Sequence, residues 1–130
     1  MADWPNAEAV LVAALGTLLT GALVTTELGN DLLNELPVVQ VQRAGGDDDG
    51  FRLDRPLVDV DVYAASRLDA AAMSEQIRAY ILRVLRGSTT AGAVIGRTGT
   101  VSAPSPRPYE NTGLRRNGAT YEIYLHPVSS

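Results

Sequence analysis

A regular alternation of valine and aspartate in PLVDVDVYAAS, residues 56–66, constrains the fold of this chain more than any other feature. Successive side chains of a β-strand point to opposite faces, so the valines share one face while Asp59 and Asp61 share the other. A period of two residues over this length is typical of a strand with one buried and one solvated face. The pattern therefore predicts a strand over residues 57–64.

A helix is predicted directly after this strand. Ser66 and Asp69 have the spacing of a capping box, in which the serine side chain satisfies a free backbone N–H of the first turn. Apolar residues then recur at helical spacing from Ile77 to Leu85, which indicates one buried helix face. Gly87 is suited to end the helix, because glycine readily adopts the left-handed conformation found there. The expected helix runs to about Arg86.

The remaining segments complete a single domain over residues 1–130 of the α/β (α+β) class. Residues 1–35 predict a helical segment with Asp3 as its N-cap, and strands are expected over residues 36–42, 99–103 and 114–125. The run GGDDDG predicts a charged loop over 43–55, and three prolines predict a proline-rich loop over 104–113. We therefore expect a small mixed, mainly antiparallel sheet of about four strands, packed by two main helices.

Composition excludes several classes of function. The chain has no cysteine, no lysine and a single histidine, which excludes thiolate zinc sites, cysteine nucleophiles, Schiff-base lysines and multi-histidine metal sites. No P-loop or dinucleotide fingerprint is present, and no cofactor is expected. The net charge of −4 means that nucleic-acid binding requires a local arginine patch. The uncharged run 9–26 is marginal for a membrane span, and a buried helix is the favoured interpretation.

Asp59 and Asp61 are open to two interpretations. Together with Glu122 of the last predicted strand they could bind divalent metal ions in a metal-dependent phosphodiesterase. The simpler interpretation is the solvated face of a half-buried strand. The Asp47–Asp49 run lacks the full spacing of a calcium loop, so a solvated loop tip is favoured over an ion site.

Three arginines gather near the last predicted strand. Arg107, Arg115 and Arg116 lie close in sequence to Tyr109 and could contact a phosphate or a carboxylate of a partner. A solvated strand start explains the same pattern equally well.

Three stretches carry a resemblance to a known family: RPLVDVDVYAAS, the helical AAAMSEQIRAYILRVLRG, and PYENTGLRRNGATYEIYLHP. Their order and patterning over roughly residues 36–127 resemble the tail terminator proteins of long-tailed, siphovirus-type bacteriophages, especially those that infect actinobacteria. The resemblance implies a non-enzymatic virion protein of the tail–neck region that forms a six-fold ring. Such a ring caps the tail tube, stops its polymerisation and provides the face onto which the head docks. Head-completion or other neck proteins of the same virion are the nearest alternative, and a host interaction module is a further one.

The resemblance also implies partners and contact residues. The expected partners are other copies of the chain, the tail tube protein and the head-completion or connector proteins. DNA is expected to pass through the lumen without specific binding, no membrane is involved, and assembly takes place in the host cytoplasm. Asp59 and Asp61 are expected to face solvent, a neighbouring subunit or the lumen, and Arg115 and Arg116 to pair with carboxylates of the next subunit. The expected contact residues are Asp47, Asp48, Asp49, Arg52, Arg55, Asp59, Asp61, Arg107, Tyr109, Arg115 and Arg116.

Overall fold

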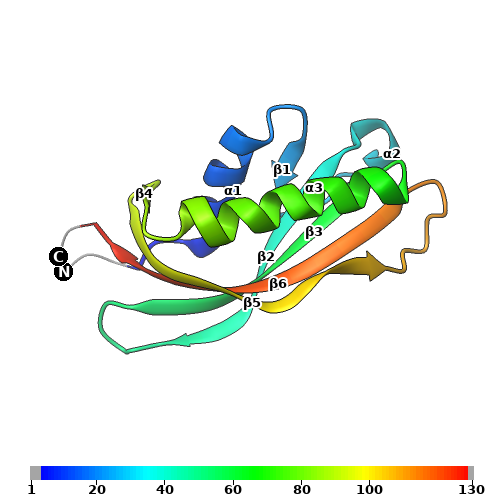
Figure 1. The fold of residues 1–130 in the computed structure, drawn as a ribbon. Helices are drawn as coiled ribbons and strands as arrows, with labels where there is room; N and C mark the ends of the chain where they lie inside the picture. The colour runs from blue at the N-terminus through cyan, green and yellow to red at the C-terminus, as the bar shows by residue number, and fades with distance from the viewer. Residues whose placement is uncertain (1–3, 129–130) are drawn as a thin grey trace.

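The computed structural model describes residues 4–128 and shows a curled mixed sheet with its two longer helices on one face (Figure 1). The described sheet has six strands in the order β1-β2-β3-β6-β5-β4. Neighbouring strands are antiparallel except for β1 and β2, which are parallel. The strands are β1 (Leu23–Thr25), β2 (Val38–Asp48), β3 (Asp54–Ala64), β4 (Thr89–Thr90), β5 (Ala93–Arg107) and β6 (Arg115–Pro127). The helices are α1 (Ala7–Leu18), α2 (Leu32–Glu35) and α3 (Arg67–Tyr80), and α3 continues as a π-helical turn, η1 (Ile81–Leu85). The mixed α+β class is confirmed, whereas the expected number of about four strands is too low.

The main core lies between the sheet and the helices α1 and α3. The β3 valines at 58, 60 and 62 are buried, as their alternation predicts, and β6 adds Tyr121 and Ile123. Leu15 of α1 and Ile77 of α3 close this core from above. Burial raises the pKa of Tyr121 to about 12, which keeps its hydroxyl neutral at physiological pH.

A second, smaller cluster lies against the other face of the sheet. Val38, Tyr63 and Leu114 are buried there. They are covered by segments that flank the strands, including Leu36 and Tyr109. This cluster fixes the 108–114 connection against the ends of β2 and β3, and so positions the residues that follow it in β6.

The capping predictions are confirmed for α3. The Ser66 hydroxyl accepts a hydrogen bond from the backbone N–H of Asp69 at 3.1 Å, and Gly87 has a φ of 79° just beyond the helical turns. The Thr98 hydroxyl of β5 donates to the Ile81 carbonyl at 2.9 Å, where α3 passes into its π-helical turn. The predicted cap Asp3 lies outside the described residues; Asn6 caps α1 by accepting from the N–H of Ala9 at 3.1 Å.

The N-terminal segment is only partly helical. Residues 1–35 were expected to form a helical segment, but after α1 the chain forms strand β1 and then the short α2. The short strand β1 lies beside the start of β2, with Leu23 opposite Val38. Within residues 4–128, no helix combines the length and apolar composition that a membrane crossing requires.

The prediction of a charged loop over residues 43–55 is wrong in extent, because the loop is much shorter. β2 continues to Asp48 and β3 begins at Asp54, so the two strands form a long hairpin with a tight turn. The register shifts between Arg43 and Gly45, and Gly45 and Gly46 have φ values of 123° and 99°. The glycines therefore form a β-bulge that bends the hairpin rather than ending it.

The proline-rich loop predicted over residues 104–113 is also too long. β5 passes through Pro104 and Pro106 to Arg107 and pairs with β6 as far as Arg116. Because β4 pairs only with Ala93 and Val94, the rest of β5 is an edge strand of the described sheet. Proline is tolerated on an edge, where its missing N–H faces away from the paired strand.

Candidate functional site

Asp59 and Asp61 lie on the sheet face opposite the main core and have different roles. Asp61 is 2% exposed, and its carboxylate accepts hydrogen bonds from Nη2 and Nε of Arg116 at 3.1 and 3.3 Å. Nη1 of Arg107 lies 3.5 Å from the same carboxylate. The half-buried Asp59 accepts a 2.5 Å hydrogen bond from the Thr120 hydroxyl. The expectation that Asp61 faces solvent, a neighbour or the lumen is therefore wrong, because arginines of its own chain cover it.

The metal-site interpretation of these carboxylates is also wrong. The Glu122 side chain lies over Gly99 of β5. A Cβ added to Gly99 would be only 2.9 Å from the Glu122 Oε1. In the described part of the chain, no group of three histidine, aspartate or glutamate side chains is placed to hold a metal ion. The pair Asp59 and Asp61 therefore binds hydroxyl and guanidinium groups of neighbouring strands.

Gly118 makes room for this ion-pair cluster. It lies directly opposite Asp61 in the β3–β6 register. A Cβ at this position would collide with the Asp61 carboxylate and lie 2.8 Å from the Arg107 guanidinium carbon. The hydrogen bond to Asp61 raises the pKa of Arg116 further above its ordinary value, so the Arg116 guanidinium group stays protonated at physiological pH.

A cavity of about 440 Å³ opens beside this cluster, and we call it the arginine pocket. Four arginine residues contribute to its lining: Arg67 from the start of α3, Arg107 from the end of β5, and Arg115 and Arg116 from the start of β6. Its other walls are largely apolar and include Ala70, Pro106, Pro108, Tyr109 and Leu114. Such a cavity suits a ligand that combines negative charge with an apolar group.

Two contacts hold the wall of the arginine pocket in place. The rings of Tyr63 and Tyr109 pack edge-to-face with their centroids 5.3 Å apart. The Arg116 guanidinium carbon lies 5.9 Å from the centroid of the Tyr63 ring, within range of a cation–π contact. Asn117, also in the lining, is 4% exposed, and its Oδ1 has no hydrogen-bond partner within residues 4–128.

The turn between β2 and β3 is ordered by its own aspartates, and we call residues 47–53 the hairpin tip. Oδ1 of Asp49 accepts hydrogen bonds from the backbone N–H groups of Phe51, Arg52 and Leu53 at 2.9, 2.8 and 2.9 Å. Oδ1 of Asp48 accepts another from Gly50 at 2.7 Å. The aspartate run that predicted a solvated, repelling tip therefore forms a defined turn.

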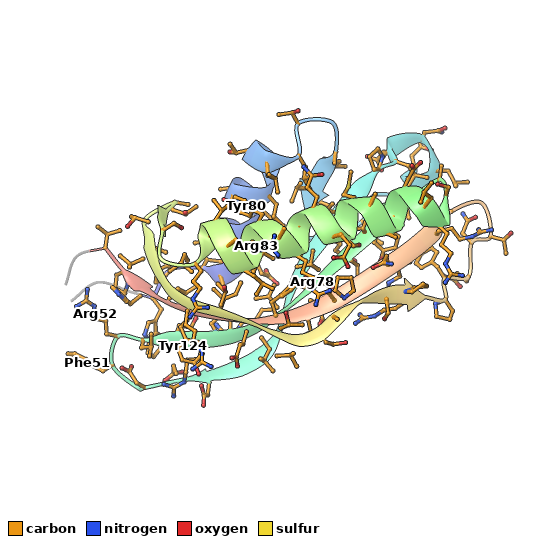
Figure 2. The ribbon with its side chains drawn as sticks, in the orientation of Figure 1. Phe51, Arg52, Arg78, Tyr80, Arg83 and Tyr124 are labelled. Atoms are coloured by element: carbon orange, nitrogen blue, oxygen red, sulfur yellow. The ribbon has the colours of Figure 1, made fainter. Side chains whose placement is uncertain are left out.

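Charged and aromatic side chains extend from this turn. Asp47 forms a 2.5 Å ion pair with Arg55. Arg52 turns back toward β6, where its Nη2 donates to the Pro127 carbonyl at 3.2 Å. Phe51 is 71% exposed and points away from the sheet (Figure 2). The only phenylalanine of the chain is thus the most prominent apolar group of the hairpin tip.

We expect acid to disorder the hairpin tip through Asp49. Its backbone hydrogen bonds, chiefly from Arg52 and Phe51, lower the pKa of the Asp49 carboxyl. A group with a lowered pKa in the folded state stabilises the fold above its unfolded pKa and loses that contribution as pH falls. NMR shifts of the Phe51 and Leu53 amides should therefore hold above about pH 4 and move toward disordered values below it.

Asp49→Asn should abolish this titration, because the amide side chain carries no charge. Asp48→Asn is the matched control, because Asp48 accepts one backbone hydrogen bond in the same turn and the transition should remain. Amide shifts of Phe51 and Leu53 that titrate unchanged in Asp49→Asn would contradict the assignment.

The predicted contact residues separate into two groups at opposite ends of the hairpin and sheet (Figure 1). Asp47, Asp48, Asp49, Arg52 and Arg55 belong to the hairpin tip or its base, whereas Asp61, Arg107, Tyr109, Arg115 and Arg116 surround the arginine pocket. Arg116, expected to pair with the next subunit, pairs instead with Asp61 of its own chain.

Two residues that shape these surfaces were missed. Phe51 could have been noticed as a lone aromatic residue within a charged run. Arg67 follows the helix cap Ser66 and carries no sequence signal that connects it with Arg107 or Arg115.

Comparisons with known proteins agree with this fold. The model of a family described as phage tail termination protein matches residues 3–102. No curated protein matches the chain. Among solved structures, a chain of the "Virion of native gene transfer agent (GTA) particle" is similar, with a TM-score of 0.65 and 13% sequence identity. The alignment covers 92% of this chain and 94% of that chain, and at this identity the likeness shows the fold.

Proposed function

The chain belongs to the phage tail termination protein family, and from that membership we propose that it forms a hexameric ring that caps the tail tube. In the proposed role the ring stops further polymerisation of the tube and provides the interface onto which the head docks. The family is one of structural tail proteins, so the chain is a virion component and not an enzyme. The observation that carries the proposal is the family match over residues 3–102.

The arrangement of the two charged surfaces supports a ring. A closed ring of identical subunits requires two different surfaces on each subunit, one that meets the subunit before and one that meets the subunit after. The hairpin tip and the arginine pocket differ in shape and charge and lie at opposite ends of β6. When such a ring closes, both of these surfaces on every subunit are in contact with a neighbouring subunit.

The proposed partners follow from this position in the particle. The tail tube protein contacts one side of the ring, the head-completion or connector proteins contact the other, and a single domain over residues 1–130 provides both sides. DNA passes through the lumen without specific binding, which the net charge of −4 favours because phosphates are repelled. Assembly takes place in the host cytoplasm, and the exclusive use of arginine among basic residues favours an actinobacterial host.

Electron microscopy of the protein mixed with polymerised tail tubes tests the proposal. We expect a ring at one end of each tube, and tubes that stop growing when fresh tube protein is added. Tubes without the protein are the control and should continue to lengthen. Particles that ignore tubes but bind head assemblies would contradict the terminator role and place the protein on the head side of the neck.

A further inference from the structure

The hairpin tip and the arginine pocket have complementary charge. The tip carries three consecutive carboxylates, Asp47 to Asp49, on a turn that projects from the sheet (Figure 1), and Asp47 pairs with Arg55 of the same hairpin. Four arginine residues line the pocket, and the Asp61 carboxylate pairs with two of them, Arg107 and Arg116. Within residues 4–128, neither Arg67 nor Arg115 forms an ion pair. Positive charge therefore remains in the pocket for a carboxylate that arrives from outside.

The two surfaces also match in their apolar parts. Phe51 exposes 71% of its surface at the tip, so its ring is free to insert into a cavity of a partner. The pocket provides apolar walls from Ala70, Pro108 and Tyr109 beside its arginine residues. An aromatic anchor in a pocket that also holds arginine is a typical centre of a protein–protein interface. Phe51 can in addition make cation–π contacts there.

The geometry of β6 requires the contact to be intermolecular. Asp54, at the base of the tip, pairs with Leu125 near the end of β6, whereas the pocket surrounds Arg115 to Asn117 at its start. At about 3.3 Å per residue, the length of β6 separates these positions by roughly 30 Å within one chain. A tip that binds a pocket must therefore bind that of another copy. A contact between two different surfaces is head-to-tail, and it closes into a ring where the rotation allows.

We propose that the hairpin tip of one copy docks in the arginine pocket of the next, with Phe51 as its anchor and the aspartates facing Arg67 and Arg115. This inference rests on the proposed ring and identifies its subunit interface. The occupant of the pocket is thus a second copy of this chain.

A photo-crosslinking probe tests the proposal on rings seated on tail tubes. Replacing Phe51 with p-benzoylphenylalanine keeps an aromatic group at the tip and attaches it to whatever lies within reach on illumination. We expect a ladder of crosslinked oligomers, with the attached peptide coming from residues 106–117 or from the start of α3. The same probe at Tyr124, on the open sheet face, is the control and should not label these segments.

The possible outcomes separate this proposal from the proposed function. Tube-bound rings in which the Phe51 probe labels the tube protein, DNA or another surface would overturn the docking and leave the capping role standing. A protein that never binds tubes would overturn both. Phe51→Ser gives a second test, because the side chain is exposed and its loss should not disturb folding. We expect it to weaken ring formation about thirtyfold, whereas Val84→Ser, another exposed apolar position, should not. Unchanged assembly of Phe51→Ser would contradict the role of Phe51 as anchor.

Discussion

Arg116→Met is expected to lower the free energy of unfolding by about 3 kcal/mol, because it leaves a buried carboxylate without its main partner. The Asp61 side chain is 3% exposed, and Arg116 contacts it through two nitrogens. The remaining contact, from Arg107, is longer at 3.5 Å. This loss of about 3 kcal/mol lies at the lower end of the range for breaking a buried ion pair. The Arg116 side chain is 28% exposed, so water can reach Asp61 once the guanidinium group is removed. Urea denaturation followed by circular dichroism measures the change.

Arg115→Met is the matched control for this prediction. Arg115 is the neighbouring residue in the same strand and is exposed, and its guanidinium group donates only to the carbonyls of Thr112 and Leu114. We expect a change below about 1 kcal/mol. Equal losses in the two variants would show that the pairing with Asp61 is not what makes Arg116 important.

Gly46→Ala is expected to lower the free energy of unfolding by about 3 kcal/mol, because it forces the β2–β3 hairpin open. The φ of Gly46 is 99°, a conformation that side chains disfavour. In addition, a Cβ there would collide with the Arg55 carbonyl and come within 2.8 Å of backbone atoms of Pro56 and Leu57. These atoms belong to β3 and cannot move without shifting the strand. Thermal unfolding and hydrogen exchange at the hairpin amides measure the effect.

Gly45→Ala separates strain from collision in the same bulge. Gly45 also has a positive φ, 123°, but a Cβ there would meet nothing within 4 Å. We expect a loss of about 1 kcal/mol from backbone strain alone. If Gly45→Ala were as damaging as Gly46→Ala, the close approach of the two strands would not explain the requirement for glycine.

The sequence correctly predicted the strands and helices in which buried apolar residues recur at a regular spacing. The valines of β3 and the apolar stripe of α3 gave the correct buried faces, and Ser66 and Gly87 marked the limits of the helical segment. These signals are local, because each depends on residues a few positions apart. The two loops were predicted too long because glycine, aspartate and proline disfavour a regular strand on average. In the structure, glycines form a β-bulge within β2 and prolines lie on the edge strand β5. Which strands pair with β2 and β5 decides whether these residues are tolerated, and the local sequence does not show that pairing.

The candidate site could be predicted only as a set of residue types. Its contact residues were identified, but the burial of Asp61 depends on Arg107 and Arg116, which lie 46 and 55 positions along the chain. Neither the spacing nor the local composition connects these residues. The convergence of Arg67 with Arg115 depends in the same way on how α3 crosses the sheet.

The prolines of β5 have a consequence for how this sheet meets other chains. An unpaired strand edge normally offers a row of N–H and C=O groups on which a further strand can form, and this is how sheets grow into aggregates. Pro104 and Pro106 stand in the exposed stretch of β5 and have no N–H to offer. A strand that approached this edge would find no N–H donor at these two positions. The two prolines therefore protect this edge of the sheet against the addition of a further strand.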